Sequence, residues 1–254
     1  MMVGESKKLT PSKRVAYTAV MCALLIGGQL ALSAVSGVEI VTVLMVCFCC
    51  VSGVRTGAVC AVAFTLLRCF LFGFHPTAFI LYLIYFPSLA LVFGGMGHIK
   101  KQVYENCPPL LTAVVCTALI LIAGASLFCN LSGVIKISAV YKNFVNVLLW
   151  IIFAISAALC AVFCVLTVLK KKGANTAGLI EIITVTAAAC LCTVCFTLLD
   201  DIISPLFYSW SKQTALTYFY ASFLAMLPQT VCTAVTVSTM YLPLTSVMKK
   251  AVSL

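Results

Sequence analysis

Long apolar runs, broken only by short polar segments, account for most of this 254-residue chain. Hydrophobic residues make up 63% of the sequence and charged residues only 9%, whereas about 25% of the residues in soluble domains are charged. So few charges cannot cover a surface that faces water. The pattern excludes a soluble enzyme and a soluble nucleic-acid-binding protein, and it predicts an all-α, polytopic membrane helix bundle.

The apolar runs predict about eight membrane-spanning helices within a single integral membrane domain, residues 1–254. The second and third runs are short and are separated only by Val54 and Arg55, so tilted or partly re-entrant helices also fit them. The predicted spans cover residues 15–35, 39–53, 56–72, 79–96, 110–128, 145–169, 178–199 and 217–242.

The net charge of +10 is explained by membrane topology. If the N-terminus is cytoplasmic and the eight spans alternate, twelve of the sixteen basic residues lie on the inner side, three lie outside and Arg68 lies within a span. This bias is the positive-inside pattern, and it predicts that both termini are cytoplasmic. An N-terminal signal peptide is the competing interpretation, but the apolar run after Arg14 is longer than a usual signal-peptide core.

Motifs for catalysis and for metal binding are missing from the sequence. Nearly all of the fifteen cysteines lie in the predicted spans, where a thiol behaves as a small hydrophobe. We therefore expect no disulfide framework, no zinc or haem site and no other cofactor. No Walker A motif and no hydrolase motif occurs, so we expect a protein that is not an enzyme and that does not hydrolyse ATP by itself.

The first span contains a row of small residues, Ala19, Ala23 and Gly27, at intervals of four. Residues four apart share one face of a helix, so this row forms a smooth stripe that another helix can approach closely. Two interpretations stay open: packing within the chain and docking of a partner helix.

A few charged residues interrupt the apolar pattern. Arg68 lies inside an apolar run, where it either serves a function or extends its charge to the outer interface. Asp200 and Asp201 are predicted to end the seventh span, where the helix dipole disfavours acids. They neutralise Arg68, bind a cationic or amine-bearing ligand, or are simply hydrated. Glu39 begins a predicted helix, where the dipole favours an acid.

The segment after Asp201 is the most aromatic part of the chain. It includes Trp210 and Tyr218, and it is typical either of an interfacial aromatic belt or of a lid that stacks on a flat ligand. Pro228 and Gln229 are then expected to interrupt the eighth span, and a glutamine side chain is rarely left facing lipid.

Several segments together resemble a known family. The basic start with Arg14 and the Ala19/Ala23 face are followed by SGVEIVTVLMV, GVRTGAVCAVAFTLLRCFLFGFHP, TAFILYLIYFPSLALVFGGMG and, near the end, FYASFLAMLPQTVCTAVTVSTMYLPLTSVMKK. This pattern is similar to the substrate-binding S component of an energy-coupling factor (ECF) vitamin transporter. Members of that family have six helices, so the resemblance implies a two-helix insertion over residues 110–169. It divides the chain into a basic tail (1–14), four helices (15–109), the insertion, and two helices with a basic tail (170–254).

The resemblance implies a substrate-capturing subunit of the bacterial plasma membrane, which binds a vitamin-like small molecule at its outer face. A transmembrane T component and two cytoplasmic ATPases would be its partners, with Ala19, Ala23 and Gly27 on the docking face. The resemblance places the substrate contacts at Glu39, Arg68, Asp200, Asp201, Trp210, Tyr218 and Gln229. The alternatives are a stand-alone secondary transporter or permease, and a membrane scaffold or intramembrane enzyme.

Overall fold

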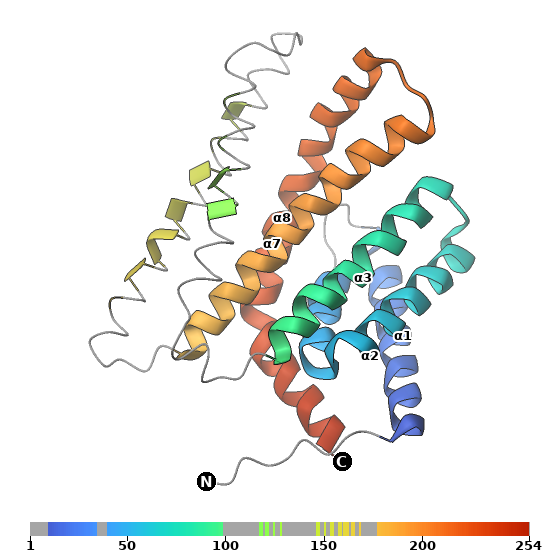
Figure 1. The fold of residues 1–254 in the computed structure, drawn as a ribbon, viewed down its shortest axis with the longest axis vertical. Helices are drawn as coiled ribbons and strands as arrows, with labels where there is room; N and C mark the ends of the chain where they lie inside the picture. Colours follow the sequence, from blue (N-terminus) through green and yellow to red (C-terminus); the bar gives the residue numbers. More distant parts are fainter. Residues whose placement is uncertain are drawn as a thin grey trace. The chain divides into compact units, whose positions relative to one another are not determined.

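The computed structural model of the chain describes residues 10–34, 40–98 and 177–253, together with isolated helical positions between 117 and 168. Glu39 and most of the predicted insertion lie outside this part. The helices are α1 (Pro11–Leu32), α2 (Val41–Phe72), α3 (Pro76–His98), α7 (Ala177–Phe207) and α8 (Lys212–Ser253) (Figure 1). No β-strand occurs among the described residues. All five helices are long and apolar enough to cross a membrane.

The described helices agree with the sequence pattern, although two of the predicted spans are joined. The first, fourth, seventh and eighth predicted spans overlap α1, α3, α7 and α8, whereas the second and third together form α2. The chain divides into two compact units, one formed by residues 1–99 and 239–254 and the other by residues 100–238. We describe each unit by itself.

Proline and glycine set the helix ends in the first unit. Pro11 occupies the first turn of α1, where its fixed φ fits the helix and its missing N–H costs no hydrogen bond. Gly73 follows the last residue of α2 with a φ of 90°, a conformation that glycine adopts more easily than other residues. Pro76 then begins α3, so the segment between Gly73 and Pro76 separates two helices.

Helix α2 folds back on itself at Gly53, which has a φ of 79° and a ψ of 173°. Cys49 and Gly57 would lie about 12 Å apart along a continuous helix. A Cβ placed on Gly57 would instead lie 2.8 Å from the Cys49 Sγ. The chain therefore reverses at Gly53, and α2 consists of a first arm, residues 41–52, and a second arm, residues 54–72. The break lies one residue before the Val54–Arg55 separation that the sequence indicates.

The first arm of α2 and the end of α3 supply the core of this unit. All ten residues from Val41 to Cys50 are buried, as expected for a helix that is apolar on every side. Gly94 and Gly97 of α3 face the backbone at the Gly53 reversal, and a Cβ on Gly97 would overlap the Cys50 carbonyl group. These glycines let α3 pack directly against the backbone of α2.

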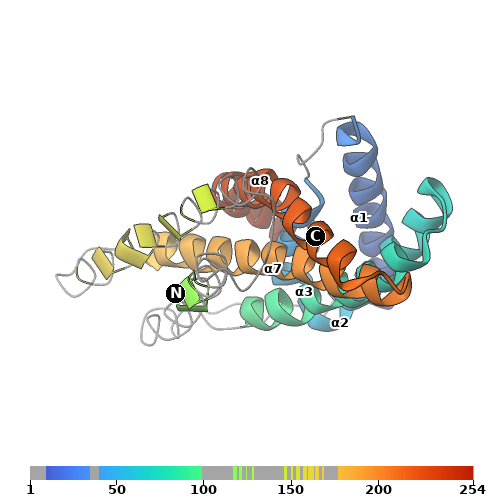
Figure 2. The same cartoon turned by 90° about the horizontal axis from the view of Figure 1, so that it is seen from above.

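In the second unit, α7 and the part of α8 up to Ser238 form a helical hairpin. A short turn, residues 208–211, joins them, and Ser211 caps α8 by accepting a hydrogen bond from the Thr214 backbone N–H at 3.2 Å. Figure 1 shows α7 and α8 meeting at this turn, and Figure 2 shows the same pair from above. Further along the hairpin, the Thr193 and Thr233 hydroxyls lie 3.1 Å apart.

The hairpin corrects two expectations from the sequence. The structure extends α7 to Phe207, so Asp200 and Asp201 lie inside the helix and do not end it. The aromatic segment after them is mostly helical, because α7 ends at Phe207 and Lys212 already begins α8. Pro228 and Gln229 also lie within the helical course of α8 and do not interrupt it. The strong apolar pattern ends near Leu199, but the backbone stays helical to Phe207, and Asp200 and one oxygen of Asp201 accept hydrogen bonds within the hairpin.

Candidate functional site

A polar cluster lies between α7 and α8 near the turn that joins them. Asp200 accepts two hydrogen bonds, one from the Ser204 hydroxyl to Oδ1 at 2.8 Å and one from the Tyr218 hydroxyl to Oδ2 at 2.6 Å. Ser204 lies one turn further along α7, and Tyr218 lies on α8. Both oxygens of the Asp200 carboxylate are therefore satisfied, and Asp200 fixes the position of the Tyr218 ring.

The neighbouring carboxylate, Asp201, has unused hydrogen-bonding capacity. Its Oδ2 accepts a hydrogen bond from the Ser222 hydroxyl at 2.8 Å, but the same hydroxyl lies 2.7 Å from the Phe219 carbonyl oxygen. A hydroxyl has one proton to donate, so the two acceptors compete for it. The Asp201 Oδ1 is buried and has no hydrogen-bond partner among the residues that the structure describes. Asp201 is thus able to accept bonds from a ligand that carries N–H or O–H donors.

A series of aromatic rings extends from the turn to this cluster. Phe207 and Tyr208 lie with ring centres 5.2 Å apart, Tyr208 stacks on Trp210 at 5.7 Å, and Trp210 meets Tyr218 edge to face at 5.0 Å. Because the Tyr218 hydroxyl also donates to Asp200, the last ring of the series connects directly to the carboxylates. The arrangement combines aromatic faces with acidic groups within one hairpin.

Four of the seven predicted substrate contacts, Asp200, Asp201, Trp210 and Tyr218, are therefore brought together. Ser204 and Ser222 complete the cluster. Only the position of Ser204, four residues after Asp200, was a signal in the sequence. Gln229 lies further along α8 and is partly buried. Glu39 lies outside the described residues, so its predicted role stays a prediction.

Arg68 belongs to the other unit, where it packs on aromatic rings. Its guanidinium carbon lies 3.9 Å from the centre of the Tyr82 ring and 5.6 Å from that of Phe72. Such cation–π contacts stabilise a charge that has lost part of its hydration. The Nε of Arg68 is buried and makes no hydrogen bond within the described part of the chain. Arg68 is thus held against Tyr82 of α3.

The small-residue row of α1 is not used for close packing within the first unit. Ala19, Ala23 and Gly27 are all exposed, and a Cβ added to Gly27 would meet nothing within 4 Å. The adjacent Gly28 has the opposite surroundings, because a Cβ there would lie 2.6 Å from the Ile40 side chain. Internal packing in the described structure therefore uses Gly28 and leaves the predicted row open.

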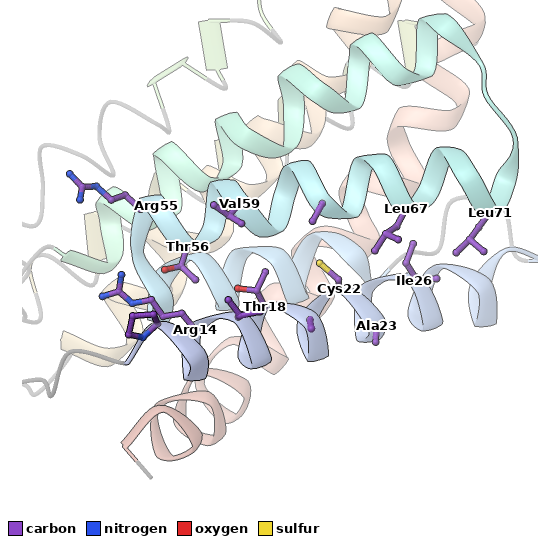
Figure 3. Close-up of a pocket in the computed structure, with 14 residues that line it drawn as sticks. Arg14, Thr18, Cys22, Ala23, Ile26, Arg55, Thr56, Val59, Leu67 and Leu71 are labelled. Carbon is purple, nitrogen blue, oxygen red and sulfur yellow. The ribbon is translucent and has the colours of Figure 1, made fainter.

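Part of that row lines an open groove between α1 and the second arm of α2, with a volume of about 770 Å³ (Figure 3). Arg14, Thr18 and Ala19 contribute from α1, and Arg55 and Thr56 from α2. Both arginines lie at the same end of the groove (Figure 3). The other lining residues are Pro11, Val15, Cys22, Ala23, Ile26, Val59, Ala63, Leu67 and Leu71.

No protein-family description, no curated protein and no solved structure matches this chain. Among the described residues, no group of three or more histidine, cysteine or acidic side chains is arranged to hold a metal ion. The polar cluster, the groove and the sequence pattern are the features of this chain that point to a function.

Proposed function

We propose that this chain is a substrate-capturing membrane subunit of an ECF-type importer, and that the polar cluster of the α7–α8 hairpin binds its substrate. The observation that carries the proposal is the under-satisfied carboxylate of Asp201 beside the ordered Asp200–Tyr218 pair. Ionisable groups within apolar helices are costly and mark functional sites. The resemblance to S components supplies the class of transporter.

The chemistry of the cluster favours a flat, amine-bearing, vitamin-like molecule. Asp201 offers acceptors for an ammonium or amide N–H, and Trp210 with Tyr218 offers ring surfaces for stacking or for a cation. Arg68, Glu39 and Gln229 are included among the proposed contacts on the resemblance alone. A carboxylate on the substrate would be the group that Arg68 recognises.

Partner docking on α1 completes the proposal. The exposed row Ala19, Ala23 and Gly27 suits close approach of a helix from a transmembrane T component. Two cytoplasmic ATPases would then supply the energy. We further propose eight spans in all, six of an S-component core and two inserted, with both termini in the cytoplasm and the protein in the bacterial plasma membrane.

A second candidate function is a stand-alone, proton-coupled secondary transporter. It is favoured by the same Asp201 side chain, because a carboxylate with an unpaired oxygen inside a membrane helix can carry a proton in transporters. The two candidates differ in their source of energy. The resemblance and the exposed docking row favour the first.

Reconstitution of the purified chain alone in liposomes separates these candidates. The subunit proposal predicts that the chain binds amine-bearing vitamins but accumulates none of them when a proton gradient is imposed. Accumulation that depends on the gradient and is lost in Asp201→Asn would overturn it in favour of the secondary transporter. Tyr208→Phe, which alters an exposed ring outside the carboxylate bonds, is the matched control.

Docking is tested by substitutions at the two adjacent glycines of α1. Gly27→Leu adds its side chain in open space, so we expect normal folding and ligand binding but loss of uptake in cells that contain the partner proteins. Gly28→Leu collides with Ile40 and is expected to lower thermal stability. Normal uptake by Gly27→Leu would contradict docking on this face.

A further inference from the structure

The groove between α1 and the second arm of α2 has ends of different chemistry. Arg14 and Arg55 are the charged residues among its lining, and the Thr18 and Thr56 hydroxyls lie near the same end (Figure 3). Ile26, Leu67 and Leu71 lie toward the opposite end. The groove is therefore cationic and hydroxyl-bearing at one end and apolar along the rest, which is the complement of an amphiphile with an anionic head.

The two guanidinium groups are available to a ligand. Arg14 and Arg55 are exposed, and neither guanidinium group has an ion-pair or hydrogen-bond partner within the described ranges. Guanidinium groups bind phosphate through paired N–H donors. Two guanidinium groups beside two hydroxyls supply several hydrogen-bond donors for the oxygens of one phosphodiester.

The dimensions of the groove suit one acyl chain. Pro11 and Ile26 line it fifteen residues apart on α1, a distance of about 22 Å along the helix axis. One leaflet of the hydrocarbon core is about 15 Å thick. The groove is open along its length between the two helices, since Val15 and Val59 in its walls are 70% and 62% exposed. A lipid can therefore enter from the bilayer.

We propose that this groove binds an anionic phospholipid, with the phosphate on Arg14 and Arg55 and one acyl chain lying between α1 and the second arm of α2. The proposal does not depend on the transport function. Basic pockets between membrane helices are known to bind anionic head groups. Ala19 and Ala23 line the same groove, so the acyl chain would cover part of the small-residue row of α1.

Native mass spectrometry of the purified chain tests this proposal. The chain is incubated with equal amounts of phosphatidylglycerol and phosphatidylcholine that carry the same acyl chains. We expect phosphatidylglycerol adducts to predominate, and the preference to fall about tenfold when Arg14→Gln and Arg55→Gln are combined. Lys212→Gln combined with Lys249→Gln removes the same charge outside the groove and is expected to leave the preference unchanged.

Two further arms separate lipid binding from simpler explanations. Ala63→Phe fills the apolar part of the groove, so we expect fewer adducts of both lipids. Excess inorganic phosphate is expected to leave the adducts in place, because it lacks an acyl chain. Equal retention of the two lipids by the wild-type chain, an equal effect of both double variants, or displacement by phosphate alone would overturn the proposal.

Discussion

Gly95 and Gly97 lie two residues apart in α3 and have opposite surroundings. A Cβ on Gly97 would overlap the Cys50 carbonyl group, whereas a Cβ on Gly95 meets nothing within 4 Å. Overlap with backbone cannot be relieved by a side-chain rotation. The two positions therefore separate the effect of contact from the effect of adding a methyl group to a helix.

We predict that Gly97→Ala lowers the stability of the purified protein by about 1–3 kcal/mol, the usual cost of forcing extra volume into a packed site. Gly95→Ala is the control and is expected to change stability by less than about 1 kcal/mol. Thermal unfolding in detergent measures both. Equal melting temperatures for the two variants would show that α3 does not pack on the Cys50 backbone.

The residues of the candidate site were predictable in type but not in arrangement. The rarity of Asp200, Asp201 and Arg68 in apolar runs marked them at once. Ser204 and Ser222 carried no such signal, because serine is common in membrane helices and acquires its role only through the register of α7 against α8. That register follows from the length of the turn, and the end of α7 was predicted too early.

At the scale of elements, the reversal at Gly53 defines the first unit. Two apolar runs separated by a basic residue predicted separate helices, and the backbone reverses there as expected. The exact residue depends on conformation: Gly53 has a φ of 79° with a ψ of 173°, a combination that essentially only glycine adopts. The apolar pattern places the break between the two runs, but hydropathy does not identify the residue at which the backbone turns.

We predict that Gly53→Ala destabilises this reversal by about 1–3 kcal/mol because of backbone strain. The readout is a cross-link between Cys22 and Cys60, whose Sγ atoms lie 3.7 Å apart across α1 and the second arm of α2. In a chain that retains only these two cysteines, mild oxidation is expected to join them efficiently, and less efficiently after Gly53→Ala. Gly95→Ala, in open space on α3 and without a positive φ, is the control. An unchanged cross-linking yield would contradict the strain argument.

The α7–α8 hairpin depends on polar contacts as well as apolar packing. The Thr193 and Thr233 hydroxyls lie 3.1 Å apart and both side chains are buried. We predict a coupling energy of about 0.5–1.5 kcal/mol between Thr193→Val and Thr233→Val in a double-mutant cycle, the range found for hydrogen bonds between membrane helices. Unfolding of the four proteins in detergent measures it. Additive effects of the two substitutions would mean that the hydroxyls do not interact.

At the scale of the whole molecule, scarcity of charge was the most reliable guide. It predicted an all-helical membrane protein, and the described part of the chain consists of helices, five of which are long and apolar enough to cross a membrane. The count of eight spans and the cytoplasmic placement of both termini stay predictions. Hydropathy separated the two runs of α2, and the backbone reverses between them at Gly53.

The proposed function combines three features of the chain that are separate in the sequence. Acids, aromatic residues and a small-residue row were each visible as exceptions to an apolar pattern. The hairpin joins the first two into one cluster, and the first unit leaves the third exposed. The proposed function places substrate recognition on α7 and α8 and partner docking on α1, so we expect substitutions to disrupt the two independently.

Mass spectrometry of the small molecule retained by the purified protein tests whether the α7–α8 cluster is the substrate site. We predict that the wild-type chain retains an amine-bearing small molecule and that Tyr208→Phe retains the same amount of it. Asp201→Asn is expected to retain at least about tenfold less of the molecule, because the variant loses a charge-assisted hydrogen bond. Equal retention of the same molecule by the wild-type chain and Asp201→Asn would contradict the assignment of the α7–α8 cluster as the substrate site.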